Sequence, residues 1–324
     1  MKKLFVLSCV ALATLASCSK SEDIEAPQAQ KEIAFSVATD KSRAPIEGTS
    51  FDDDQKIYVS AYNSVSGNYF SGVEFSNTGD TWKAGKYWPV NGVTSFLAYA
   101  ATGDVTSFNP TWGAKYADNV VFDIASGFYK AETGTTTTTP YIDLLYASGE
   151  QKAEKDYSSV SMTFNHTGAW VVFNVKLASG LTGAKVTLNT FQLANLFKGG
   201  KVVVDNTTYA GAKASWVFSG DAADYDVESF TAKDLSAAEN YTFGAIIPEQ
   251  NQTAIKFNYT LASLDTNNPA FTAQTATYEY PLSRFDKWEM GKKYVYNITI
   301  AFKEIEIAPS VTDWGTPSES DVKI

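Results

Sequence analysis

Two short motifs near the amino end carry residue types that can be modified covalently. The first, Leu15-Ala16-Ser17-Cys18, ends an apolar stretch that follows Lys2 and Lys3. The stretch is too short to span a bilayer as a helix, and small residues before a cysteine are typical of a lipoprotein signal. We therefore expect cleavage after residue 17 and lipidation of the Cys18 thiol. Ordinary signal cleavage beside an incidental cysteine is the alternative interpretation.

A lipidated Cys18 would hold the chain at a membrane, because several acyl chains together exceed the marginal hold of one. We expect the outer membrane, since Ser19 follows the cysteine where aspartate is the usual signal for retention at the inner membrane. Residues 20–30 are polar and acidic, and this composition predicts a flexible tether.

The second motif is Lys41-Ser42-Arg43-Ala44, a basic site for proteolysis that lies shortly after an alternating segment. In that segment Ile33, Phe35 and Val37 alternate with smaller residues, which is the period of a half-buried strand. Fully burying three such side chains would stabilise a fold by at most about 5–9 kcal/mol, comparable with the stability of a whole domain. We predict that cleavage after Arg43 releases this strand and that another strand must then fill its place.

The usual catalytic motifs are missing from the sequence. It contains no GxSxG, no HExxH, no P-loop and no glycine-rich dinucleotide fingerprint. The single histidine, His166, cannot form a site that needs two imidazoles, and we interpret it as a hydrogen-bonded structural residue. Asp52-Asp53-Asp54 lacks the spacing of an EF-hand and is typical of a solvated turn. We expect no enzyme, cofactor or metal site, and the sequence leaves open only a glycosidase with two dispersed carboxylates.

Composition favours a sheet-rich protein with an acidic surface. The 324 residues are enough for two ordinary domains, and 44% hydrophobic residues can fill their cores. The formal net charge of −10, with no basic stripe, excludes nucleic-acid binding. Cys9 leaves with the signal and Cys18 is lipidated, so no disulfide is expected. Stability must then come from the core and from the sheet ladders.

Short alternating apolar runs separated by turn residues predict an all-β protein. The clearest runs are residues 169–177, 253–261 and 293–302, in which alternate side chains face opposite sides. Residues 191–198 are the exception, and we expect a short helix there, ended by Gly199-Gly200. We place a domain boundary at this glycine pair.

Several motifs resemble a known family when they are taken together in their order and spacing. They are the lipobox with the segment from Ile33 to Ala44, Tyr87-Trp88-Pro89, Asp143-Leu144-Leu145-Tyr146-Ala147, Phe164-Asn165-His166, Ala245-Ile246-Ile247-Pro248, Gly291-Lys292-Lys293-Tyr294-Val295-Tyr296 and Thr312-Asp313-Trp314. Over nearly its whole length the chain resembles the fimbrillin-like family of Bacteroidales lipoproteins, which comprises the type V pilins and their accessory subunits.

The resemblance implies two tandem transthyretin-like β-sandwich domains after a lipoprotein signal peptide. Applied to this chain, it gives a signal peptide at 1–17, a lipidated tether with a removable first strand at 18–43, an N-terminal domain at 31–200 and a C-terminal domain at 201–324. It also implies an arginine-specific protease that cuts between Arg43 and Ala44. The protein would then move from the outer membrane into a surface fimbrium.

The resemblance further implies polymerisation by a strand from the C-terminal region of another copy or of a related pilin subunit. The apolar residues of our candidate donor strand are Ile305, Ile307, Val311, Val322 and Ile324. An added strand gains ladder hydrogen bonds and side-chain pockets, and a head-to-tail contact of this kind is open-ended, as a fibre requires. The sequence leaves open whether the subunit belongs to the shaft, the tip or the anchor.

A surface glycan-binding lipoprotein, or a tip adhesin, is the alternative function. The aromatic residues that could stack on sugars are Trp82, Trp88, Trp112, Trp170, Trp216, Trp288 and Trp314. Most of them lie within or beside predicted strands, where aromatic side chains usually belong to the core. A host glycan or host protein is therefore a further candidate partner, and it is compatible with the pilin interpretation.

Overall fold

A computed structural model of the chain describes residues 31–39, 51, 56–79, 81–101, 110–113, 120–124, 132–133, 143–149, 152–153, 156–180, 183–197, 199–205, 212–227, 230–264, 273–282, 287–301 and 305–313. Several residues singled out in the sequence lie outside these ranges: Cys18, Arg43, Ala44, Asp52-Asp53-Asp54, Trp314, Val322 and Ile324. The predictions made for them stay predictions.

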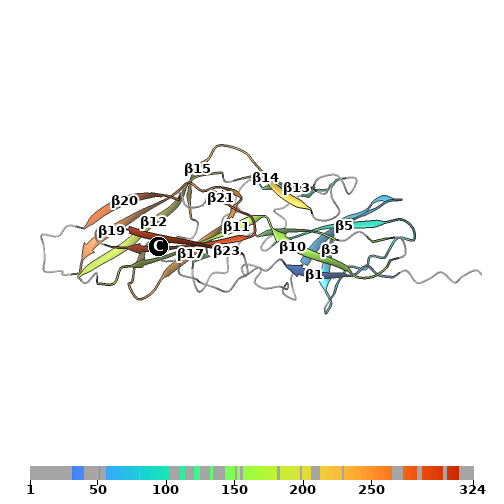
Figure 1. Cartoon of the computed structure of the whole chain (residues 1–324), viewed down its shortest axis with the longest axis horizontal. Coiled ribbons are helices and arrows are strands. Elements are labelled where there is room, and N and C mark those ends of the chain that lie inside the picture. Colours follow the sequence, from blue (N-terminus) through green and yellow to red (C-terminus); the bar gives the residue numbers. More distant parts are fainter. Residues whose placement is uncertain are drawn as a thin grey trace, which may run out of the picture. The chain divides into compact units, whose positions relative to one another are not determined.

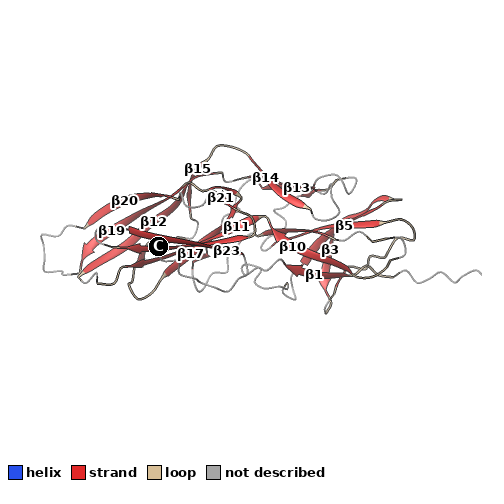
Figure 2. Cartoon of the chain, in the orientation of Figure 1, coloured by secondary structure: helices blue, strands red, loops and turns tan. Residues whose placement is uncertain are grey.

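Every regular element of the described residues is a β-strand (Figure 2). This confirms the prediction of an all-β protein. The described part of the chain accordingly offers no helix that could cross a membrane.

The helix expected at residues 191–198 is wrong. These residues largely belong to β12 (Ala184–Leu196), which pairs antiparallel with β19 (Ala254–Ser263). The register of this ladder shifts between Leu188 and Thr190, which is a β-bulge. The bulge changes the phase of the strand, so the buried positions Leu188 and Phe191 are three residues apart. Within residues 191–198 the adjacent residues Leu193 and Ala194 are both buried, so this part of the strand lacks a regular alternation.

Seven described strands form a closed barrel in the order β1-β10-β9-β5-β2-β3-β4. Their bounds are β1 Phe35–Thr39, β2 Lys56–Asn63, β3 Gly67–Asn77, β4 Trp82–Lys83, β5 Thr94–Ala101, β9 Leu144–Ser148 and β10 Val160–His166. Figure 1 shows β1 running beside β10. Because β1 also pairs with β4, it is the strand that joins the two ends of the sheet.

The interior of the barrel is filled by aromatic and aliphatic side chains that are less than a tenth exposed. Its largest members are Phe35, Phe51, Phe75, Trp82, Trp88, Phe96 and Phe164. They come from segments distant in sequence, and they pack mostly edge to face, as aromatic quadrupoles favour. This core therefore depends on long-range pairing.

The remaining strands form three larger sheets and one short ladder. The first is β23-β22-β11-β17-β8, with bounds Ile305–Asp313, Lys292–Ile300, Gly168–Leu177, Tyr241–Pro248 and Glu132–Thr133. The second is β15 (Ala223–Asp226), β12, β19 and β20 (Gln274–Pro281), with β16 (Lys233–Asp234) also on β12. The third is β14-β13-β7-β6, at Lys213–Phe218, Gly200–Asp205, Val120–Ile124 and Pro110–Thr111. The ladder joins β18 (Gln250–Asn251) to β21 (Lys287–Trp288).

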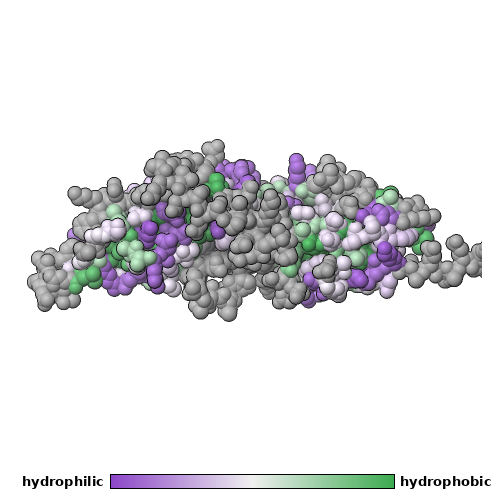
Figure 3. Space-filling model, turned by 60° about the horizontal axis from the view of Figure 1, so that its bottom comes forward, coloured by the Kyte–Doolittle hydropathy of each residue, from purple (hydrophilic) through white to green (hydrophobic). Residues whose placement is uncertain are grey.

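Strand β5 is buried on both faces over its whole length. Phe96 faces the barrel core, whereas Tyr99 belongs to a second core and packs against Phe122 of β7, with ring centroids 5.2 Å apart. The second core also contains the inward side chains of β11, β12 and β22. On the surface, hydrophilic and hydrophobic residues are interspersed over the described part of the face in Figure 3.

Sheet partners change between β10 and β11. Strands β11 and β12, which we assigned to the first domain, pair with β17, β22 and β19, all of which follow residue 200. These ladders therefore cross a boundary at Gly199-Gly200, while the ladders β7–β13 and β8–β17 cross a division at Thr167. From Lys31 onward the chain forms one compact unit. The division into two tandem sandwich domains stays a prediction.

Candidate strand-exchange site

The first described segment of the chain is paired on both sides. On one side β1 runs parallel to β10, with Phe35 opposite Val160 and Thr39 opposite Phe164. On the other side Phe35 pairs with Trp82 of β4. The ladder continues before β1, because the Ile33 amide donates to the Lys86 carbonyl at 2.7 Å. We call the place that residues 31–39 occupy between β10 and β4 the strand slot.

The side chains of this segment alternate as the sequence predicts. Ile33 and Phe35 are 0% exposed, Val37 is half-buried, and Ser36 faces solvent. The Phe35 ring lies edge-on against Phe75 and Phe96, with centroids 4.9 and 5.2 Å away. Burying the two fully covered side chains stabilises the barrel by about 3–6 kcal/mol. Thus residues 33–37 occupy an apolar slot of the barrel and do not lie free on its surface.

Polar contacts fix the start of the segment in the strand slot. The Glu32 Oε1 carboxylate oxygen accepts a 2.8 Å hydrogen bond from the Gly85 amide, and Gly85 has a φ of 63°. The Trp88 amide donates to the Lys31 carbonyl at 3.0 Å, and the Val160 amide donates to the Ala34 carbonyl at the same distance. A positive φ is the conformation that glycine adopts without strain, so this turn suits residue 85.

Sequence reasoning identified the strand but not the walls of its slot. Trp82, Phe75 and Phe96 line it from three different strands, and Val160 lies opposite Phe35 in the ladder. No local pattern could have found these residues, because their proximity depends on how strands far apart in the sequence pair.

The candidate donor strand lies at the edge of a different sheet. Residues 305–313 form β23, which pairs antiparallel with β22 so that Ile307 is opposite Ile298 and Ile305 is opposite Ile300. Val311 is 42% exposed and lies opposite Tyr294. Pro309 is accommodated because β23 is an edge strand, where a missing amide proton breaks no internal ladder. Val322 and Ile324 lie outside the described residues.

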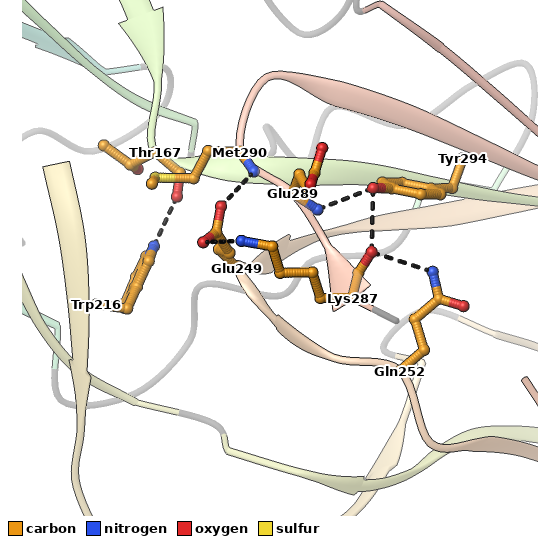
Figure 4. A network of polar contacts seen from close by, with 8 residues as sticks. All are labelled: Thr167, Trp216, Glu249, Gln252, Lys287, Glu289, Met290 and Tyr294. Carbon is orange, nitrogen blue, oxygen red and sulfur yellow. Dashed lines mark hydrogen bonds and ion pairs between the residues drawn. The ribbon is translucent and has the colours of Figure 1, made fainter. Parts of the chain in front are cut away.

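A polar network fixes the turn that leads into β22, the neighbour of β23 (Figure 4). Glu249 contacts two residues of this turn. Its Oε1 lies 2.8 Å from Lys287 Nζ, and its Oε2 accepts a hydrogen bond from the Met290 amide at 3.2 Å. The Tyr294 hydroxyl accepts from the Glu289 amide at 2.9 Å and donates to the Lys287 carbonyl at 3.1 Å. The hydrogen bond that Lys287 donates to Glu249 raises the pKa of Lys287, and burial raises the pKa of Tyr294. The turn is therefore held independently of β23.

A second polar contact of Figure 4 fixes the start of β11. Trp216 Nε1 donates to the Thr167 carbonyl at 2.6 Å. In addition, the Gly291 amide donates to the Gly168 carbonyl at 2.9 Å, which connects the same turn to β11. These bonds lie where the chain passes from the barrel into the next sheet.

His166 is buried beside Asp143, with 2.7 Å between His166 Nδ1 and Asp143 Oδ2. Both side chains are at most 1% exposed. This burial agrees with the prediction of a hydrogen-bonded structural histidine, because a catalytic group must be reachable by its substrate. Within the described residues no group of three acidic, histidine or cysteine side chains could hold a metal ion.

This geometry defines a class of protein. It is an all-β protein in which the first described strand, β1, completes a barrel and the last described strand, β23, forms the edge of a sheet. The chain belongs to the fimbrillin-like family, whose model matches residues 42–314. This confirms the family resemblance noted in the sequence. No curated protein matches the chain.

Solved structures that resemble this chain include proteins from Bacteroides species. A fimbrial protein from Bacteroides vulgatus has a TM-score of 0.59 at 17% identity, covering 88% of this chain and 99% of that one. Two proteins, each described as a "putative cell adhesion protein", have TM-scores of 0.49. The one from Bacteroides uniformis is 16% identical and covers 87% of this chain and 98% of that one. The one from Bacteroides ovatus is 18% identical, with coverages of 90% and 100%. At 17% identity the likeness to the Bacteroides vulgatus protein shows the fold alone.

Proposed function

We propose that this chain is a structural subunit of a cell-surface fimbrium of the type V pilus kind and that it supports adhesion. It is exported as a lipoprotein through Cys18, reaches the outer membrane, and is cut by an arginine-specific protease between Arg43 and Ala44. The segment of residues 31–39 then leaves the strand slot, and a strand from another copy or a related pilin subunit replaces it. Membership of the fimbrillin-like family supports this role.

The observation that carries the proposal is the position of Phe35. It is fully buried in the barrel core, yet it lies only a few residues before the candidate cleavage site. A strand that completes the core and lies shortly before a basic motif can be detached by a single cut, as a temporary occupant must be.

Cleavage alone does not empty the strand slot. The ladder to β10 and the burial of Ile33 and Phe35 still hold the cut segment, by about 3–6 kcal/mol from the apolar contacts. What cleavage removes is the covalent link that keeps the segment at a high effective concentration. An incoming strand with similar apolar side chains can then compete with the cut segment for the strand slot. The edges of β10 and β4 stay paired with one strand or the other, which avoids an exposed sheet edge.

We propose that the incoming strand comes from the C-terminal region, from residues 304–324, which include Ile305, Ile307, Val311, Val322 and Ile324. Because β23 pairs along the whole of β22, its donation to another copy requires that it leave this edge. The network around Glu249 and Tyr294 keeps the turn before β22 in place when β23 leaves. The contact is head to tail, so copies can be added without limit.

The test compares two arginine variants in cells that assemble the protein on their surface. Arg43→Ala should abolish the ladder of polymers on unboiled gels, and amino-terminal sequencing should find Ala44 at the start of the wild-type surface protein. Arg284→Ala removes the only other arginine of the chain and serves as the matched control. This variant should still give the series of polymer bands on unboiled gels. An unchanged ladder in Arg43→Ala would contradict the proposal.

A further inference from the structure

The edge strand β20 differs from the other edges of the described sheets. It pairs with β19 alone among the described strands and lies along its outer side (Figure 1). Residues 274–279 are exposed on both faces of the strand, without the alternation of a strand that covers a core. Its ladder to β19 has no register shift, so its outer backbone groups form a regular row.

The other described edges of the large sheets carry features that discourage pairing. Strand β23 contains Pro309, β14 begins with Lys213, β15 is four residues long with two aspartates, and β6 and β8 are two residues long. Natural sheet edges are protected by proline, by lysine and by short length. Strand β20 has none of these before its last residue, Pro281, and Glu279 is its only charge. Its threonines and tyrosines favour an extended strand.

We propose that β20 pairs with the β20 strand of a second copy, antiparallel and centred on Thr277. Residue 277 is the midpoint of the proline-free stretch 274–280, so this register uses the whole stretch. It sets Tyr278 opposite the partner subunit's Ala276, a large side chain against a small one. It also sets Glu279 opposite the partner subunit's Thr275, which keeps the two carboxylates apart.

This contact is symmetric and involves only β20, so it goes beyond strand exchange in the barrel and does not depend on it. A symmetric contact joins two copies and then stops, whereas the head-to-tail exchange continues. Together they would join two fimbrial shafts side by side. The pairing can therefore be tested in Arg43→Ala chains, in which strand exchange is blocked.

Cysteine cross-linking tests the register. In the full chain with Cys9→Ser, Cys18→Ser and Arg43→Ala, we add Thr277→Cys, Thr275→Cys or Glu279→Cys singly. Opposed residues of antiparallel strands have Cα atoms about 4.5–5.5 Å apart, within reach of a disulfide. The Thr277→Cys variant should therefore form dimers under mild oxidation. The Thr275→Cys variant alone and the Glu279→Cys variant alone should not form dimers. In each of them the two cysteines of a dimer would lie about 14 Å apart along the strands. A mixture of these two should form a mixed dimer.

A lysine scan gives a second measurement that needs no disulfide. The Arg43→Ala chain should form a concentration-dependent dimer in sedimentation, and Thr277→Lys should abolish it, because a lysine on an edge strand prevents pairing. Val217→Lys is the matched control, since Val217 is 55% exposed on β14, an edge strand of another sheet, and it should leave the dimer intact. A protein that stays monomeric, or that cross-links equally at all three positions, would overturn the proposal.

Discussion

Phe35 is the largest side chain that β1 places in the barrel core. Its ring contacts Phe75 and Phe96, and no exposed surface remains on it. Replacing it by alanine leaves a cavity that the surrounding aromatic rings cannot fill, so Phe35→Ala should lower the free energy of unfolding by about 3–5 kcal/mol. Urea titration of the uncleaved chain measures this difference.

The neighbouring Ser36 provides the control, because its side chain faces solvent. Ser36→Ala should change the free energy of unfolding by less than about 0.5 kcal/mol. Equal effects of the two substitutions would mean that β1 does not contribute to the core, and the interpretation of the strand slot would then be wrong.

The raised pKa of Tyr99 leads to a prediction about stability at high pH. Burial raises the pKa of its phenol to about 12, and Tyr58, stacked on it at 5.0 Å, adds to the shift. In the unfolded chain the phenol ionises near its ordinary pKa of 10.0. Because the folded pKa is the higher one, the stabilisation is complete below about pH 10 and is lost as the pH rises toward 12.

The melting temperature should therefore fall between about pH 10 and pH 12. Tyr99→Phe removes the ionising hydroxyl but keeps the ring, so its melting temperature should fall less steeply over the same range. Thermal unfolding followed by circular dichroism at a series of pH values makes the comparison. Identical slopes for the two proteins would show that Tyr99 does not titrate in this way.

At the level of elements, alternation alone predicted most strands but failed at β12. The residues from Ala184 to Leu188 alternate, and then the bulge before Thr190 shifts the phase. Asn195 has a φ of 53°, which adds a second irregularity near the end of the strand. A bulge is set by the partner strand, here β19, so it leaves no mark that the sequence of β12 alone could reveal.

If a strand can be replaced in the strand slot, a free peptide with the same side chains should also bind there. A synthetic peptide of residues 31–39 carries the native side chains of the strand slot, so an excess of it should compete with the incoming strand and shorten the polymers formed by processed subunits. The same peptide with Phe35→Ser loses the contact with Phe75 and Phe96, and it should have much less effect. Polymer length on unboiled gels is the readout. Equal inhibition by both peptides would indicate that side-chain pockets do not select the strand.

At the level of the whole molecule, the sequence predicted the fold class and the strand that begins it, because both depend on local alternation. The walls of the strand slot could not be predicted, since Phe75, Phe96 and Trp82 meet Phe35 only through long-range pairing. The boundary expected at Gly199-Gly200 was drawn from a pair of glycines. The ladders β11–β17 and β12–β19 cross it, and only tertiary pairing could reveal them.

A reversible lock on β1 tests the central claim most directly. Ser36 of β1 and Ser161 of β10 are paired in the parallel ladder, and both are exposed. Neighbouring strands lie about 4.7–4.9 Å apart, so Ser36→Cys with Ser161→Cys should form a disulfide that holds β1 in the strand slot. Because neither substitution falls within residues 41–44, the lock leaves the cleavage site itself unchanged.

The measurement is polymer formation by this double variant after cleavage, with and without a reducing agent. Under oxidising conditions the protein should be cut at Arg43 and yet remain monomeric, because the slot stays filled. Reduction should restore polymers to the wild-type level. Polymers that form equally well with the disulfide intact would contradict strand replacement in the barrel.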